Sequence, residues 1–264
     1  MLFSNRAALL ISSVAMTTVL LHASFASAEK KRAFTVEDLY KVGRVSQLEV
    51  SASSDLAAFV VKTFDMKTNK GLSHLWIADL KPGTTQQLTR SNESDWAPRW
   101  MPDGRLAFLS ARSGSPQIWA IYVDGGEALQ LTDLPLGIEN FAVGPDRKHV
   151  AAVMSVYPEC DSMSCNAERA KAVADDKVKA RIYDKLLYRI WDRWRDETLG
   201  HVFWVPLDGG EPRDLTRGKF QTPPLDLGGN MDLTISPDGT EVAFTANMTE
   251  NPAWNTNNDI FVVS

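Results

Sequence analysis

A repeated strand pattern constrains the fold of this chain of 264 residues more than any other feature. Three segments each contain an apolar strand centred on an aromatic residue, and a Leu-Thr pair begins 12 residues after that aromatic residue. Turn-forming residues such as Asp124-Gly125-Gly126 lie between the strand and the pair, which predicts a hairpin in each segment. The aromatic residues are Trp76, Trp119 and Phe203, and the pairs begin at Leu88, Leu131 and Leu215.

A second repeated motif, Pro-Asp-Gly or a close variant, leads into another apolar strand. Proline presets the φ angle of the turn, aspartate accepts backbone hydrogen bonds, and glycine takes the left-handed position. Each unit is therefore predicted to hold four short antiparallel strands. The copies are Pro102-Asp103-Gly104, Pro145-Asp146-Arg147 and Pro237-Asp238-Gly239, with a degenerate copy at Ser53-Ser54-Asp55.

The repeat has a period of 43 residues, both from Trp76 to Trp119 and from Asp103 to Asp146. Four antiparallel strands at this period are typical of β-propeller blades, which bury their faces by stacking on neighbours around an axis. A β-sandwich also uses short strands, but it does not need the same turn at the same phase of successive units. We therefore predict an all-β chain, a β-propeller with about four visible blades.

The third unit holds an insertion at about residues 157–200, because Trp119 and Phe203 are 84 residues apart. Its first half is predicted to be helical, since apolar residues recur every four positions. The stretch 186–194 fits either an extension of that helix or a strand that pairs with residues 201–207. The residues of the helical pattern are Ala170, Ala174, Val178 and Ile182.

The fourth unit contains only three predicted strands, at residues 231–236, 241–247 and 259–264. By the 12-residue spacing, its Leu-Thr pair would begin nine residues beyond Ser264. We therefore expect residues 29–264 to form a partial propeller domain of a longer protein. A closed ring of four blades, completed by an N-terminal strand, is the alternative.

The first 28 residues are predicted to be a signal peptide. Arg6 precedes the uncharged apolar stretch Ala7–Leu21, and Ala26-Ser27-Ala28 supplies small residues at the cleavage positions. A retained membrane anchor is the alternative, although the stretch is short for a bilayer span. No later segment is long enough to span a bilayer, so we expect a periplasmic or secreted mature protein without membrane contact.

Export affects the interpretation of the two cysteines, Cys160 and Cys165. The compartment to which the protein is exported permits disulfides, and the two residues lie close together in one predicted surface loop. Metal binding is the alternative, but two thiols without a nearby histidine are an incomplete site. We predict a local disulfide.

The sequence contains no complete catalytic constellation. No Gly-x-Ser-x-Gly motif occurs, and the nearest approach, Gly71–Leu75, lies at a strand edge. The predicted mature chain has three histidines, His74, His149 and His201, and we interpret the equivalent His74 and His201 as strand-edge residues. No metal or cofactor site is predicted, and the net charge of −5 argues against nucleic acid as a partner. We expect the chain to have no peptidase activity alone.

Two segments resemble a known family. Phe34–Leu39 with the following Arg44-Val45-Ser46, and Arg181–Leu187 with Arg189–Trp194, are similar to the propeller of secreted bacterial prolyl oligopeptidase-family serine peptidases. The likeness is to the dipeptidyl-peptidase and acylaminoacyl-peptidase branches and covers residues 34–264. A histidine often stands in that family at the position of Ile190. The resemblance implies a C-terminal α/β-hydrolase domain holding the catalytic Ser, Asp and His, which this chain lacks.

The resemblance also implies a role for the propeller and its partners. The propeller would cover the active site of the hydrolase domain on the same full-length chain and admit short or unfolded peptides. The whole enzyme would release dipeptides or acyl-amino acids. A non-catalytic periplasmic interaction propeller, similar to Tol-associated proteins, is the alternative.

In dipeptidyl peptidases, an insertion in the propeller supplies acidic residues that bind the free amino terminus of the substrate. The resemblance therefore makes the acidic residues of the insertion candidates for this role, with a solvated charged surface as the alternative interpretation. The candidates are Glu168, Asp192, Asp196 and Glu197.

Overall fold

The structure is a computed structural model that describes residues 32–190, 193–224 and 232–264. The predicted signal peptide, residues 1–28, lies outside the described residues. The chain divides into two units, Met1–Asp38 and Leu39–Ser264. In the first unit, the Asp38 carboxylate accepts hydrogen bonds from Arg32 Nη2 at 2.6 Å and from the Thr35 amide at 2.9 Å. Helix α1 spans Val36–Lys41.

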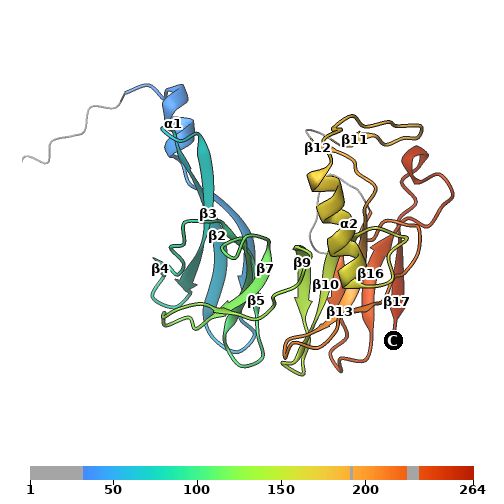
Figure 1. Ribbon diagram of the computed structural model, residues 1–264. Coiled ribbons are helices and arrows are strands. Elements are labelled where there is room, and N and C mark those ends of the chain that lie inside the picture. Colours follow the sequence, from blue (N-terminus) through green and yellow to red (C-terminus); the bar gives the residue numbers. More distant parts are fainter. Residues whose placement is uncertain (1–31, 191–192, 225–231) are drawn as a thin grey trace, which may run out of the picture. The chain divides into compact units, whose positions relative to one another are not determined.

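The second unit is all-β, as the sequence predicts, and its described strands form consecutive antiparallel sheets (Figure 1). The first sheet and the second sheet each contain four strands in chain order. The first sheet contains β1 (Arg44–Val50), β2 (Leu56–Asp65), β3 (Lys70–Asp79) and β4 (Thr84–Gln87). The second contains β5 (Asp95–Trp100), β6 (Leu106–Ser110), β7 (Gln117–Ile121) and β8 (Leu129–Gln130).

The third and fourth sheets follow the same meander (Figure 1). The third has the order β9 (Ile138–Val143), β10 (His149–Val156), β13 (Leu199–Pro206) and β14 (Arg213–Asp214). The fourth has the order β15 (Leu233–Ile235), β16 (Val242–Ala246) and β17 (Asp259–Val263), with a 3-10 turn at Pro252–Trp254 between its last two strands.

Strands β10 and β13 pair without a break from His149↔Pro206 to Val156↔Leu199, although a long segment separates them in the chain. That segment contains helix α2, Met163–Asp175, and a two-stranded hairpin of β11 (Arg189–Ile190) and β12 (Arg193–Trp194). The third sheet is therefore closed by regular ladder pairing, and the intervening segment extends from one end of it.

Two details of the insertion differ from the sequence prediction. Helix α2 ends at Asp175, so Val178 and Ile182 lie outside it. The helix stops there because the Asp176 side chain accepts the Val178 amide at 2.8 Å in a local turn, while Lys179 Nζ donates to the Ala174 carbonyl at 2.9 Å.

The stretch 186–194 neither extends the helix nor pairs with β13, so both alternatives for it were wrong. Arg189 pairs with Trp194 and Ile190 with Arg193 in a separate short hairpin. Both edges of β13 are occupied. Strand β10 pairs with it along its whole length, and on the other edge β14 pairs with Phe203 and Trp204 while the Thr222 amide donates to the Gly200 carbonyl. The described residues Arg189, Ile190, Arg193 and Trp194 therefore pair with each other.

The repeated Leu-Thr pair has the same structural role in three sheets. In each, the threonine hydroxyl accepts the backbone N–H of the residue that precedes the strand's aromatic residue, and the leucine amide donates to the carbonyl of that same residue. The hydroxyl distances are 3.0 Å for Leu75 to Thr89, 2.9 Å for Ile118 to Thr132 and 2.9 Å for Val202 to Thr216. The leucine amide distances are 2.8 Å in all three sheets. The buried threonine thus replaces a missing ladder partner, which explains the constant spacing.

The aspartates of the repeated Pro-Asp turns accept hydrogen bonds from the backbone two residues ahead, as the sequence predicts. Asp103 accepts from the Arg105 amide at 3.1 Å, Asp146 from Lys148 at 2.9 Å and Asp238 from Thr240 at 3.1 Å. Partial burial opposes ionisation at Asp103 and Asp146, but hydrogen bonds from Arg105 and His149 outweigh it and lower the pKa of both. Hydrogen bonds from Ser236 and Thr240 lower the pKa of Asp238.

We expect these three turns to make stability depend on acid pH. A carboxyl group whose pKa is lower in the folded state stabilises the fold above its unfolded pKa of about 3.9, and this stabilisation is lost as pH falls through the folded pKa. The triple variant D103N/D146N/D238N should therefore lose less stability than the parent on acidification from about pH 5 to about pH 2, while both remain folded at neutral pH. Urea unfolding across this range measures the difference, with D124N in another exposed turn as the control. Parallel pH profiles for parent and triple variant would refute the prediction.

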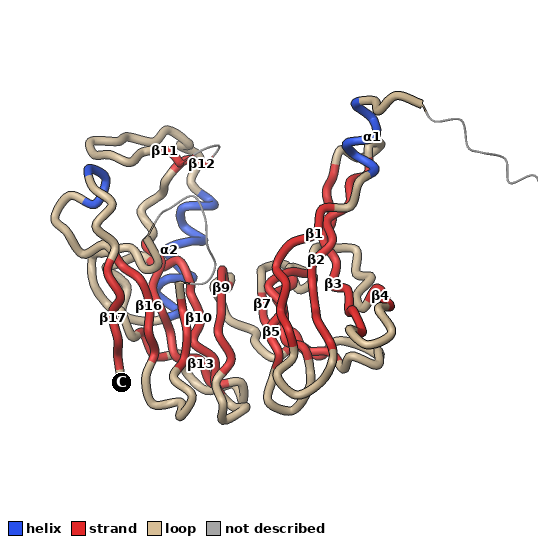
Figure 2. The backbone as a smooth tube through the Cα atoms, turned by 180° about the vertical axis from the view of Figure 1, so that it is seen from behind, coloured by secondary structure: helices blue, strands red, loops and turns tan. Residues whose placement is uncertain are grey.

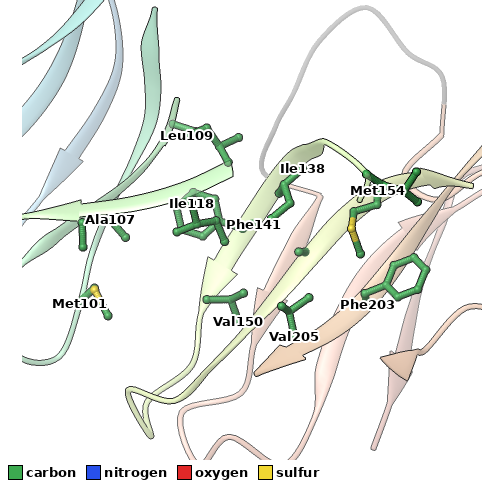
Figure 3. Close-up of a cluster of buried hydrophobic side chains, with 14 of the residues drawn as sticks. Met101, Ala107, Leu109, Ile118, Ile138, Phe141, Val150, Met154, Phe203 and Val205 are labelled. Atoms are coloured by element: carbon green, nitrogen blue, oxygen red, sulfur yellow. The ribbon is translucent and has the colours of Figure 1, made fainter. Parts of the chain in front are cut away.

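Buried side chains join each sheet to the next in the second unit. One cluster contains Ala107 and Ile118 of the second sheet and Phe141, Val150 and Val205 of the third (Figure 3). A second cluster joins the first and second sheets, and a third cluster joins the third and fourth. The core is therefore a series of layers between successive sheets, an arrangement compatible with a β-propeller.

Candidate functional site

The acidic candidates of the insertion occupy three different settings. Asp196 and Glu197 lie in the loop between β12 and β13, whereas Glu168 is exposed on helix α2. Asp192 lies outside the described residues. The structure therefore brings together only Asp196 and Glu197 among the described candidates.

Glu197 is held by an arginine of helix α2. Arg169 Nη2 lies 2.9 Å from Glu197 Oε2, and its Nε lies 3.8 Å from Glu159 Oε1. The same guanidinium carbon is 5.6 Å from the centre of the Tyr157 ring. Glu197 is thus compensated by a cation of the chain itself, which makes it a poor receptor for a second one.

Several charged side chains of the insertion act on Tyr157. Burial raises the pKa of the Tyr157 hydroxyl, and the Asp196 carboxylate raises it further, whereas Arg169 lowers it. Glu197 and Glu159 add smaller effects in the same direction as Asp196. Tyr157 therefore stays protonated at neutral pH and can donate a hydrogen bond beside a cluster of carboxylates.

A cavity of about 290 Å³ collects residues from the third sheet and from the insertion. Asp196 Oδ1 at this cavity accepts the Thr198 amide at 3.0 Å, and Glu139 accepts a hydrogen bond from the Ser155 hydroxyl at 2.5 Å. These contacts fix both carboxylates in place. The polar residues that line the cavity are Glu139, Ser155, Arg193, Arg195, Asp196, Thr198 and Gln221.

The cavity combines two carboxylates with two guanidinium groups. Carboxylates bind an ammonium group, and guanidinium groups bind carboxylates and carbonyl oxygens. A smaller cavity of about 140 Å³ shares Arg195 and Gln221 with it and has Leu186, Leu187 and Pro252 in its wall. The two adjoining cavities can therefore receive a short zwitterionic chain with an apolar side chain.

Glu139 was missed by the sequence analysis. It lies on β9, at a register shift where Asn140 pairs with Val153 but Ile138 pairs with Met154, so Glu139 has no partner on β10. The available signal was an acidic residue inside a mostly apolar strand of the repeat, at a position separated from the insertion by the whole of β10.

The two cysteines fix the start of helix α2. In the structure Cys160 and Cys165 form a disulfide, with their Cα atoms 5.5 Å apart. The Ser162 hydroxyl caps the helix by accepting the Cys165 amide at 3.2 Å, and the buried Asn166 side chain accepts the Tyr157 amide at 2.7 Å. The beginning of the helix that bears Arg169 is thus tied to the end of β10.

Each of the three histidines among the described residues lies beside an aspartate. His201 is 2% exposed and lies with Nδ1 2.8 Å from Asp214 Oδ2 and Nε2 3.1 Å from the Gly218 carbonyl. His74 Nδ1 is 3.7 Å from Asp95, and His149 Nδ1 is 2.5 Å from Asp146. Gly71–Leu75 lies within β3 and does not form a nucleophile turn. No group of three metal-ligating side chains occurs among the described residues.

Comparison with known proteins shows in which class of protein this fold occurs. No family model matches the chain. Among solved structures, the acylaminoacyl peptidase of Pyrococcus horikoshii is similar in fold, with a TM-score of 0.58 and 14% identity over 86% of this chain and 32% of that protein. This likeness shows that the fold occurs in part of a peptidase.

The curated relatives define the relationship more closely. Dipeptidyl-peptidase 5 of Porphyromonas gingivalis is 32% identical over 99% of this chain and 37% of its own length. The uncharacterized peptidase YuxL of Bacillus subtilis is 28% identical over 88% of this chain and 34% of its own length. The chain thus spans about a third of the length of the relatives it matches. The resemblance to prolyl oligopeptidase-family peptidases is confirmed, since the chain is homologous to a part of such proteins.

Proposed function

We propose that the chain is the substrate-gating propeller portion of an exported serine exopeptidase that releases dipeptides or acyl-amino acids from peptides. The observation that carries this proposal is the 32% identity with dipeptidyl-peptidase 5, which extends over 99% of the chain but only 37% of the relative. The relatives' remaining length leaves room for the hydrolase domain that the resemblance implies. In this proposal the catalytic Ser, Asp and His belong to that domain.

The sheet arrangement supports the propeller assignment. Three four-stranded meanders and a three-stranded one follow each other in chain order, and buried clusters join each to the next. We assign the sheets as successive blades, with the segment from residue 157 to 200 as an insertion in the third. Sequencing of the complete reading frame that encodes the chain tests the whole assignment. We expect it to encode further blades, followed by Gly-x-Ser-x-Gly, Asp and His.

Export is part of the proposal and rests on the sequence of residues 1–28. Among the described residues, no helix is long and apolar enough to cross a membrane. Amino-terminal sequencing of exported protein should begin at Glu29. An intact Met1 in a membrane fraction would refute cleavage.

The disulfide should be present in the exported protein. We expect mass spectrometry of periplasmically expressed protein to show Cys160 linked to Cys165. Because the bond closes a short loop, its removal in C160S/C165S should cost no more than about 2 kcal/mol of unfolding free energy. Two free thiols in the exported protein would contradict the prediction, and so would failure of the double variant to fold.

The pocket at Asp196 and Glu139 is our choice for the site that receives the amino terminus of the peptide. Among the insertion's acidic candidates in the described residues, Asp196 lines the cavity and its carboxylate has no salt bridge, whereas Glu197 forms one with Arg169. Glu139 adds a second carboxylate to the same cavity. A charge-assisted hydrogen bond between an ammonium and either carboxylate would orient the peptide's first residue.

Peptide binding to the chain tests this site. We expect D196N and E139Q each to weaken binding of a short peptide with a free amino terminus by about tenfold, about 1.4 kcal/mol. The matched control is E197Q, which neutralises the neighbouring carboxylate that Arg169 already compensates and should change affinity by less than about twofold. Isothermal titration calorimetry measures all four proteins. Equal affinity for the same peptide with an acetylated amino terminus would exclude an amine site.

The same experiments distinguish the alternative, a non-catalytic interaction propeller. That alternative predicts a reading frame without a nucleophile motif, and equal affinity for peptides with a free and an acetylated amino terminus. Both curated relatives compared above are named as peptidases, which favours the first function.

A further inference from the structure

The two cavities of the candidate site share a residue whose side chain is tied to a strand. The cavities of about 290 Å³ and about 140 Å³ have Arg195 and Gln221 in common. Among the described residues, Arg195 is hydrogen-bonded through its backbone, and its carbonyl accepts the Tyr183 hydroxyl at 2.8 Å. Gln221 is held by its side chain, because its Oε1 accepts the Gly200 amide at 3.0 Å. Gln221 is therefore the fixed side chain of the shared wall.

The segment that carries Gln221 lies directly against the beginning of β13. Besides the Gln221 contact, the Thr222 amide donates to the Gly200 carbonyl at 2.8 Å. A Cβ atom at Gly200 would lie 2.5 Å from Gln221 Nε2 and 2.8 Å from the Thr222 carbonyl oxygen. Both distances are too short for a Cβ contact, so this approach requires glycine. Two hydrogen bonds and a residue without a side chain thus fix the position of Gln221.

The buried His201, the next residue of β13, holds the beginning of the same segment. Its Nε2 lies 3.1 Å from the Gly218 carbonyl oxygen, and because a carbonyl oxygen only accepts, Nε2 carries the hydrogen. The ring of His201 stacks on the Phe220 ring, with the two centres 6.3 Å apart. Both contacts lie within three residues of Gln221, so His201 helps to hold Gln221 in place.

The second sheet shows what this position does in the repeat. Gln117, like His201, is buried and lies two residues before the aromatic residue of its strand. Gln117 Nε2 donates to the Leu134 carbonyl at 3.0 Å and to the Leu136 carbonyl at 3.2 Å, in the segment that leads to the third sheet. A side chain with an N–H donor at this position therefore pins the segment that leads to the next sheet. In the third sheet, that segment carries Gln221.

The smaller cavity has apolar residues from two loops in its wall. Leu186 and Leu187 come from the loop before β11, and Pro252 and Ala253 from the loop between β16 and β17. Both loops extend from the same end of the third and fourth sheets (Figure 2). The larger cavity holds the two carboxylates of the amine site. Because the Cα atom of the first residue carries both the amine and the side chain, the adjoining apolar cavity is the place for that side chain.

We propose that Gln221 limits the size of the side chain on the first residue of a bound peptide, with His201 as its positioning residue. The inference rests on the proposed function, since it uses the amine site at Asp196 and Glu139. An apolar cavity of about 150 Å³ holds a group the size of benzene. The smaller cavity, of about 140 Å³, therefore accommodates an aliphatic side chain such as that of leucine. The fused rings of a tryptophan side chain need the space that Gln221 fills.

Isothermal titration calorimetry of the full chain tests the proposal. The probes are the tripeptides Leu-Ala-Ala and Trp-Ala-Ala, both with a free amino terminus. The measured quantity is the ratio of their two dissociation constants, in which any effect common to both peptides cancels. We expect the parent to bind the leucine peptide about tenfold more tightly, because overfilling a packed site is costly.

Four variants identify the residue that sets the ratio. Q221A should reduce it to about twofold or less, because it joins the two cavities. Q221E keeps the shape of the side chain and its acceptor atom, so it should retain the ratio. H201L should reduce the ratio as Q221A does, whereas H201Q should retain it, since a glutamine can donate to the Gly218 carbonyl as Gln117 does in the second sheet. The control is Q86A, the same substitution at an exposed position of β4, which should behave as the parent does.

The results separate this inference from the proposed function. Loss of the ratio in Q221A and H201L, with its retention in Q221E and H201Q, supports the proposal. Equal affinity of the parent for both tripeptides, or an unchanged ratio in Q221A, would overturn the size limit and leave the amine site intact.

The role of His201 and the amine site have their own contrary results. A folded H201L variant with the parent's ratio would overturn the positioning role, and so would failure of H201L to fold, which would assign His201 to stability. Equal affinity for Leu-Ala-Ala and its acetylated form would overturn the amine site, whereas a ratio that Q221A still abolishes would preserve the size limit. Absence of binding of either tripeptide would overturn both.

Discussion

Replacing Phe141 with alanine is expected to lower the free energy of unfolding by about 3–5 kcal/mol. Phe141 is 1% exposed on β9 and belongs to the cluster that joins the second and third sheets (Figure 3). Its removal leaves a cavity between two sheets, and neither sheet can close it without losing its own pairing. Because small domains are stable by only about 5–15 kcal/mol, such a loss should be visible as a large shift of the urea midpoint.

Two variants show whether the cavity causes this effect. Phe141→Leu should cost about 1–1.5 kcal/mol, because it keeps most of the apolar volume. Tyr122→Ala removes an aromatic ring that is 58% exposed and should change stability by about 0.5 kcal/mol or less. A loss below about 1 kcal/mol for Phe141→Ala would contradict the tight contact between the sheets.

Replacing Asp95 with alanine is expected to cost about 3–5 kcal/mol, because it leaves a cation without its buried partner. Asp95 is fully buried at the start of β5, and its Oδ1 lies 2.6 Å from Arg112 Nη2. The Ser91 hydroxyl donates to Oδ2 at 3.0 Å. The Arg112 guanidinium carbon also lies 4.9 Å from the Trp119 ring, so the arginine cannot move into water without losing that contact.

A double-mutant cycle isolates the pair. D95A/R112A should be much less destabilised than the sum of the single variants, since it leaves no unpaired charge. The matched control is Asp55→Ala, which breaks the exposed contact of 2.6 Å with Lys81 and should cost about 1 kcal/mol or less. Strict additivity in the cycle would show that Asp95 acts through packing alone.

The candidate site could be predicted only in part. The resemblance directed attention to the acidic residues of the insertion, but the sequence contained nothing that separated Asp196 from Glu197. The separation comes from Arg169, which lies 2.9 Å from Glu197 although the two residues are 28 positions apart in the chain. Glu139 stands out in sequence as an acidic residue on a mostly apolar strand, but its connection to Asp196 could not be found there, because it is a shared cavity. Contacts of this kind depend on how elements pack, and no local pattern encodes them.

The sequence by itself determined the strands and turns of the repeat. The Pro-Asp turns and the spacing between the aromatic residue and the Leu-Thr pair are local constraints, in which an Asp carboxylate or a Thr hydroxyl satisfies a backbone N–H a few residues away or across one hairpin. Tertiary structure alone decided the separate hairpin at Arg189–Trp194 and the meeting of Glu139 with Asp196. Helix α2 ends at local hydrogen bonds of Asp176 and Lys179, which the apolar periodicity does not report. Periodicity reports which face of a strand or helix is buried. It does not report which backbone edge is already paired, or which distant charge lies opposite, and those two facts shaped the insertion and its cavity.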